Sequence, residues 1–150
     1  MIPSLLLAVH LLAAVIWVGG MAFALMVLRP SLAILAPPDR LALHRQVFQR
    51  FFRIVWHAMP LLLLSGYGLL ATLFGGFAGA PWPVHVMHLG GLVMAAVFAV
   101  IFFGPWPALR TALDGNDPPR AVAAIDRLRR LITINLAIGL LVVAIAAIVP

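Results

Sequence analysis

Histidine is the residue type best suited to chemistry in this chain, and three of its histidines lie in the outer parts of long apolar runs. His10 lies in the first run, and His85 and His88 open a later one with Met87 between them. An imidazole inside such a run gives up its hydration, so it needs a hydrogen-bond acceptor, a buried water or a metal ion. Neutral imidazole binds haem iron and copper, and a thioether favours Cu(I). These four side chains are therefore the candidate metal ligands.

The composition indicates an integral membrane protein. Of the 150 residues, 65% are hydrophobic and only 9% are charged, whereas a soluble domain carries roughly 25% charged residues. The chain has no Cys, which excludes disulfides, thiolate metal sites and thiol catalysis. It also has no Lys and no Glu, so Lys Schiff-base chemistry and a Lys or Glu proton relay are excluded. No pattern typical of a hydrolase or transferase is found, and a redox role stays open.

Four apolar runs, each of about 20 residues, have the length that crosses a ~30 Å hydrocarbon core as an α-helix. They predict spans at approximately 4–28, 52–74, 84–104 and 131–149. The connections 29–51 and 105–130 carry Arg in excess, so the positive-inside rule makes them cytoplasmic. We therefore expect a single transmembrane domain over residues 1–150. Its predicted fold is an all-α, antiparallel four-helix transmembrane bundle in a bacterial inner membrane, with both termini periplasmic.

Both Arg-rich connections are predicted to be partly helical. Asp39 follows two prolines and is placed to cap an amphipathic helix that lies on the inner leaflet. Asp117 precedes two prolines and marks a second helix start, from which the chain continues into the fourth span. Asp126 is placed to pair with an arginine three or four residues later. Arg29 and the proline after it are expected to end the first span.

This topology converts positions in the chain into depths in the membrane. The first and third spans both run inward from the periplasm, so His10, about 9 Å below the outer end of its span, shares the periplasmic half with His85 and His88. His57 falls in the cytoplasmic half, where a hydrogen bond to Asn135 on the fourth span is its expected role. The net charge of +6 is explained by the topology, and a nucleic-acid partner is not expected because the arginines alternate with spans.

A bis-histidine haem b site between the first and third spans is the favoured interpretation. Three histidines without cysteine, together with glycines that leave room between helices, suit a haem better than a copper relay. Electron transfer would be the role, with a quinone or a periplasmic redox protein as partner. The predicted cofactor-binding residues are His10, Trp17, Gly20, His85, His88 and Gly90.

Two alternatives stay open. A protein that binds copper or moves it across the membrane needs soft ligands through the bundle, and several methionines offer them, although methionines also fill cores. In a cofactor-free structural or accessory subunit, His10 would only hydrogen-bond a neighbouring helix, and the glycines would close-pack helices. Membrane lipid surrounds the spans in every case, and homo-oligomer formation stays open. The methionines in question are Met21, Met26, Met59 and Met94.

The segment from His10 to Met21 resembles the opening span of CopD-like membrane proteins, bacterial proteins named for a copper-resistance component. The resemblance covers essentially the whole chain and implies a copper-related role in the membrane. His10, Trp17 and His85 with Met87 match the family pattern by position, whereas His88 and His57 do not. Further similar segments are Arg50-Phe51-Phe52, Ser65-Gly66, Gly75-Gly76-Phe77, Val84-His85-Val86-Met87 with Gly90 and Met94, and Leu128-Arg129-Arg130-Leu131 with Asn135, Leu136 and Gly139.

A more distant similarity is to HemJ-type proteins, which are small haem-binding membrane proteins of porphyrin oxidation. They also place a His in the first span, and they are expected to use a Lys in the third. This chain has no Lys, so protoporphyrinogen oxidation is not expected, while haem binding stays open.

Overall fold

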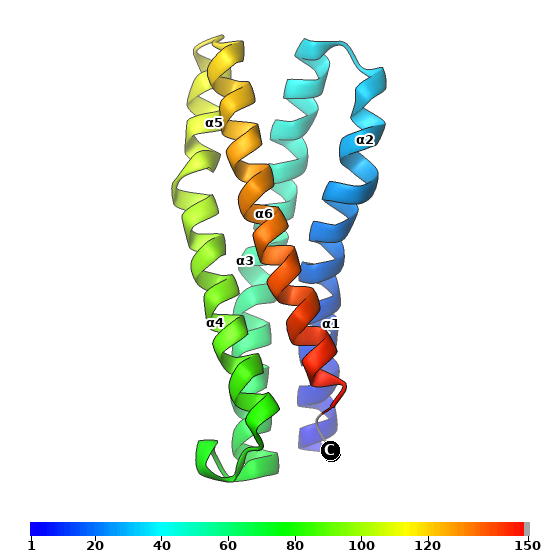
Figure 1. Ribbon diagram of the computed structural model, residues 1–150, viewed down its shortest axis with the longest axis vertical. Coiled ribbons are helices and arrows are strands. Elements are labelled where there is room, and N and C mark those ends of the chain that lie inside the picture. The colour runs from blue at the N-terminus through cyan, green and yellow to red at the C-terminus, as the bar shows by residue number, and fades with distance from the viewer. Residues whose placement is uncertain (149–150) are drawn as a thin grey trace.

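The computed structural model describes residues 1–148, and over these residues it is all-helical. Four helical segments run alternately in opposite directions along the molecule (Figure 1). All four are long and apolar enough to cross a membrane, which confirms the predicted four-span, all-α architecture. The predicted end of the fourth span at residue 149 lies outside the described residues. The four segments are Ile2–Ile34, Pro37–Phe74, Trp82–Asp114 and Pro118–Ala146.

The sequence predicted that the first segment ends at Arg29, but its helical path continues beyond this residue. Helix α1 (Ile2–Phe23) continues through a π-helical turn, η1 (Ala24–Leu28), then α2 (Arg29–Ser31) and a 3₁₀ turn, η2 (Leu32–Ile34). Pro30 lies in α2, directly after the π-helical turn, and thus inside a continuous helical path. The helical path therefore passes the proline and ends about one turn later.

The second segment is one helix of 38 residues, α3 (Pro37–Phe74). The expected separate helix on the inner leaflet is wrong, because that stretch continues directly into the second span. The predicted cap is wrong as well: the N-cap is Ala36, and Asp39 lies in the first turn without a capping hydrogen bond. The helix ends at Gly75, whose φ of 67° is the left-handed conformation that a glycine adopts most readily.

The rest of the chain is a 3₁₀ turn, η3 (Phe77–Gly79), followed by α4 (Trp82–Phe103), α5 (Pro105–Asp114) and α6 (Pro118–Ala146). The predicted start of α6 is confirmed, since the Asp117 carboxylate accepts a hydrogen bond from the Arg120 backbone N–H at 3.1 Å. The predicted pairing of Asp126 is confirmed too, with 3.3 Å between its Oδ1 and Arg129 Nη2.

The helices form two hairpins, with α1 packed mainly on α3, and α4 and α5 packed on α6. The start of α1, the α3–α4 connection and the end of α6 lie together, and we call this the terminal end (Figure 1). The η2–α3 and α5–α6 connections lie together at the opposite end, which we call the arginine end. Both predicted Arg-rich connections therefore reach the same side of the molecule.

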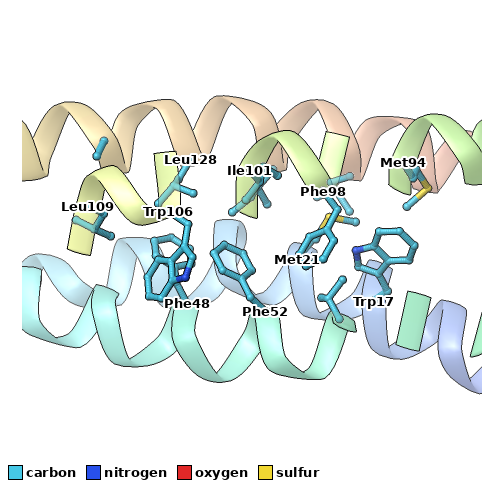
Figure 2. Close-up of a cluster of buried hydrophobic side chains, with 14 of the residues drawn as sticks. Trp17, Met21, Phe48, Phe52, Met94, Phe98, Ile101, Trp106, Leu109 and Leu128 are labelled. Carbon is cyan, nitrogen blue, oxygen red and sulfur yellow. The ribbon is translucent and has the colours of Figure 1, made fainter. Parts of the chain in front are cut away.

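An aromatic core joins the two hairpins (Figure 2). The Phe52 ring on α3 lies edge-on to Phe98 and Trp106 of the other hairpin, with ring centroids 5.9 Å and 5.4 Å apart. Trp17 on α1 contacts Phe98 in the same manner at 6.3 Å. Many large apolar side chains on the outer faces, such as Leu5 and Leu64, are instead exposed. Such an outward apolar surface suits a bundle surrounded by lipid.

Candidate metal centre around His10

His10 is held by the neighbouring helix α3. Its Nδ1 lies 3.0 Å from the backbone oxygen of Leu62 and 3.2 Å from the hydroxyl oxygen of Ser65. Because a carbonyl oxygen can only accept, Nδ1 carries the proton and donates it, and Nε2 keeps its lone pair. A backbone carbonyl that orients one ring nitrogen in this manner is a regular feature of metal-binding histidines. The arrangement therefore presents Nε2 as a ligand atom.

Ser65 and Gly66 together form the surface on which the imidazole rests. Ser65 is buried, and its hydroxyl donates to the Leu61 carbonyl of its own helix. A Cβ added at Gly66 would lie 3.1 Å from His10 Cε1, so the missing side chain makes room for the ring. The sequence analysis did not identify these two residues as part of the site, although a Ser-Gly pair within an apolar span is a visible signal.

His85 and His88 lie at the terminal end, among aromatic rings. His88 is half-buried and lies edge-on to Tyr67 and Phe77, with centroids 5.2 Å and 4.9 Å apart. His85 is exposed and stacked on Phe77 at 5.9 Å. No hydrogen bond or ring contact joins either of them to His10 within residues 1–148, nor is a group of three His, Cys, Asp or Glu side chains suited to a metal found there. A shared metal between the first and third spans stays a prediction.

The other predicted cofactor-binding residues lie in closely packed surroundings. Trp17 is only 1% exposed. The space beside Gly20 is taken by the Phe51 ring, and the space beside Gly90 by a methyl group of Val142. Both glycines thus allow close contact between helices, and a haem placed at either position would have to displace these side chains.

The methionines differ in their burial. Met21 and Met94 are 1% and 3% exposed and lie in the core close to Trp17 and Phe98 (Figure 2). Met59 is partly buried against the same core. Met26 is 67% exposed, and Met87 is half-buried beside the two histidines of α4. Two thioethers are therefore enclosed within the bundle, further from the terminal end than His10.

The expected hydrogen bond between His57 and Asn135 is wrong. His57 is exposed on the outer face of α3, and its Nδ1 donates to the Arg53 carbonyl one turn earlier at 2.7 Å. Asn135 is buried in α6, and neither its amide oxygen nor its amide nitrogen has a partner among residues 1–148. The two side chains could not pair because the helix rotation places His57 away from the core.

Two cavities at the arginine end bring together residues of the predicted connections and of the adjoining ends of the spans. The larger, of about 590 Å³, lies between the end of the first segment, the start of α3 and α6, and Arg29 and His44 are among its lining residues. The smaller, of about 320 Å³, lies between α3 and the α4–α5 segment, and its lining combines Trp and Phe with Arg53 and Arg110. Segments far apart in the chain supply each lining, so no local signal marks either cavity.

Comparison with known proteins agrees with the resemblance seen in the sequence. Residues 45–149 match the family described as "CopD: Copper resistance protein D". The matched range contains Ser65, Gly66 and the predicted ligands on α4, and it begins after the first span with His10. No curated protein and no solved structure matches this chain. The family match extends over more than half of the chain, and the protein is therefore a multi-pass membrane protein of the copper resistance protein D family.

Proposed function

We propose that this protein binds Cu(I) and passes it across a bacterial inner membrane, with His10 as the first ligand. The observation that carries this proposal is the hydrogen bond from His10 Nδ1 to the Leu62 carbonyl at 3.0 Å. It holds the imidazole in the tautomer whose Nε2 can bind a metal. The association of the family with copper resistance supports copper as the cargo.

The enclosed methionines supply the next ligands in this proposal. Thioethers bind Cu(I) well and offer little to harder cations. Met21 lies on the same helix as His10, eleven residues further along and hence about 16 Å deeper, and Met94 on α4 is buried in the same core (Figure 2). His10 and the methionines are thus separate steps along a path, which suits a transported ion better than a resident cofactor.

The orientation is part of the same proposal. Both connections rich in arginine lie at one end of the bundle (Figure 1). The positive-inside rule places that end in the cytoplasm, so His10 lies toward the periplasm. Copper would enter the bundle from the periplasmic side.

Copper affinity of the purified protein tests the proposal. Under reducing conditions, competition for Cu(I) with bathocuproine disulfonate should show one tightly bound ion per chain, weakened at least tenfold in His10→Ala. His57→Ala is the matched control, because His57 is exposed and bonded only to its own helix; its affinity should equal that of the unaltered protein. Met21→Leu and Met94→Leu should retain binding at His10 and slow copper uptake into proteoliposomes.

Absence of bound copper, or equal affinity in His10→Ala, would contradict the proposal. A purified protein with a Soret band that disappears in His10→Ala would replace it with the haem b interpretation.

A further inference from the structure

The larger cavity at the arginine end is built from two consecutive segments of the chain and from α6. Its walls come from the turn η1 with α2, from the first turns of α3 and from α6. Figure 1 shows α2 and α6 diverging toward this end of the molecule. The π-helical turn Ala24–Leu28 lies in the wall, and turns of this kind occur frequently at functional sites. The volume of about 590 Å³ falls within the range of small-molecule sites.

The charges that line this cavity favour an anion. Arg29, Arg40 and Arg129 contribute three guanidinium groups, and Asp126 is the one carboxylate among the lining residues. Asp126 is already engaged by Arg129 at 3.3 Å, so the remaining charge is positive. His44 lies in the same lining, and its Nδ1 donates to the Arg40 carbonyl at 2.8 Å.

Arg40 has a hydrogen-bond donor that nothing in residues 1–148 satisfies. Its Nη2 donates to the carbonyls of Ala33 and Leu35, at 3.2 Å and 2.9 Å, which holds the guanidinium against the turn before α3. Its Nε is buried and without a partner. The guanidinium is therefore fixed at the wall of the cavity, where its charge attracts an anion.

The other lining residues are apolar, and some of them lie on the side of the cavity toward the middle of the bundle. Leu25 on the first segment, Phe48 on α3 and Ile132 on α6 each follow the charged positions inward along their helices. A charged region thus lies next to an apolar wall, at the depth where the apolar part of the first segment gives way to Arg29. A ligand that fits has an anionic head and a hydrocarbon chain.

We propose that this cavity binds one anionic phospholipid, with its phosphate against Arg29, Arg40 and Arg129 and an acyl chain along the apolar wall. The surrounding membrane supplies such a molecule at the required depth, and charge complementarity selects its head group. A free phosphate would leave most of the volume and the whole apolar wall without contact. The proposal is independent of copper binding, because it involves neither His10 nor the enclosed methionines.

Native mass spectrometry of the full chain in detergent tests this site with two added lipids, phosphatidylglycerol and phosphatidylcholine. The unaltered protein should retain one phosphatidylglycerol, with at least tenfold preference over phosphatidylcholine. The double variant Arg29→Gln/Arg129→Gln should lose that preference. The double variant Arg120→Gln/Arg127→Gln is the matched control, because it removes the same charge from exposed positions outside the cavity, and it should keep the preference.

Arg29→Gln alone provides a second measurement, because it leaves the ion pair between Arg129 and Asp126 intact. We expect it to weaken the retention of phosphatidylglycerol several-fold. Equal loss in the cavity and control variants would overturn the proposal, since it would indicate a general attraction of anionic lipid to the arginine end. Displacement of the lipid by millimolar inorganic phosphate would overturn it in favour of a free anion. Retention of phosphatidylglycerol by the cavity variants would also overturn it.

Discussion

The terminal and arginine ends of this bundle accommodate polar groups in opposite ways. Near the terminal end, His10 is a single neutral ring that is hydrogen-bonded to α3 and closely covered by Gly66. At the arginine end, several guanidinium groups surround a cavity of about 590 Å³. An uncharged polar group can thus be enclosed with one or two hydrogen bonds, whereas a cluster of like charges keeps space for counter-charges or water.

The difference follows from the cost of removing each group from water. A neutral imidazole with a satisfied N–H loses little more than one hydrogen bond, and close packing around it is favourable. A guanidinium stays charged in every protein environment, so it remains where solvent, head groups or a carboxylate can reach it. Arg45 illustrates this, since it pairs with Asp114 at 2.6 Å while both side chains stay partly exposed.

The largest effect on stability is expected for a substitution that tests whether the two ends differ in the space beside their polar groups. Gly66→Leu would place a side chain where the His10 ring now lies, because a Cβ there is already 3.1 Å from Cε1. We expect a loss of about 3 kcal/mol in the free energy of unfolding from overpacking and from the displaced hydrogen bond. Titration with sodium dodecyl sulfate in mixed micelles measures the change.

Ala24→Leu is the matched substitution at the arginine end, where the added side chain can enter the large cavity. We expect it to change stability by less than about 1 kcal/mol, since it fills existing space. Equal losses of stability in Gly66→Leu and Ala24→Leu would show that the two ends are packed alike and would contradict the difference between them.

A smaller effect is expected at Asn135, whose amide is buried in α6 with neither atom paired. Asn135→Leu should raise the free energy of unfolding by about 1–3 kcal/mol, because it removes an unsatisfied polar group and keeps the same side-chain branching. Thr133→Val is the control on an exposed face of the same helix. A destabilised Asn135→Leu would reveal that Asn135 has a polar partner in the membrane, such as a water or a passing ion.

The smallest effect is expected for the ion pair between the hairpins at the arginine end. Arg45→Ala should lower the free energy of unfolding by less than about 1 kcal/mol, since the two side chains are 37% and 60% exposed and solvent weakens their attraction. Thermal unfolding at low and high salt measures it, and the difference should shrink as salt rises. A loss above about 2 kcal/mol would mean that this pair, and not the aromatic core, holds the hairpins together.

The fold was largely predictable from the sequence, because each apolar run is independently long enough to span a membrane and must form a helix there. Local rules also predicted the cap by Asp117 and the pairing of Asp126. They failed for Asp39 and Pro30, where the helical path continued past residues that usually mark its boundaries. A proline that a helical path accommodates and a proline that ends it look alike in the sequence.

The candidate site was predictable only in part. His10 was identified because an imidazole inside an apolar run gives up its hydration. Its depth in the membrane alone did not reveal which helix would supply its hydrogen-bond acceptors. The structure places the acceptors on α3, at Leu62 and Ser65, because α1 and α3 form a hairpin. The rotation of each helix about its own axis likewise decided that His57 faces outward and Asn135 inward.

The sequence by itself thus determined the class of protein, the number of spans and the common end for both arginine-rich connections, all of which depend on composition and order along the chain. Only the tertiary structure decided that His10 donates to α3, that Phe51 and Val142 fill the spaces beside Gly20 and Gly90, and that α6 joins the first two segments around a cavity beside Arg40. The physical reason is that length and hydrophobicity are summed along one helix, whereas contacts depend on the rotation and pairing of several.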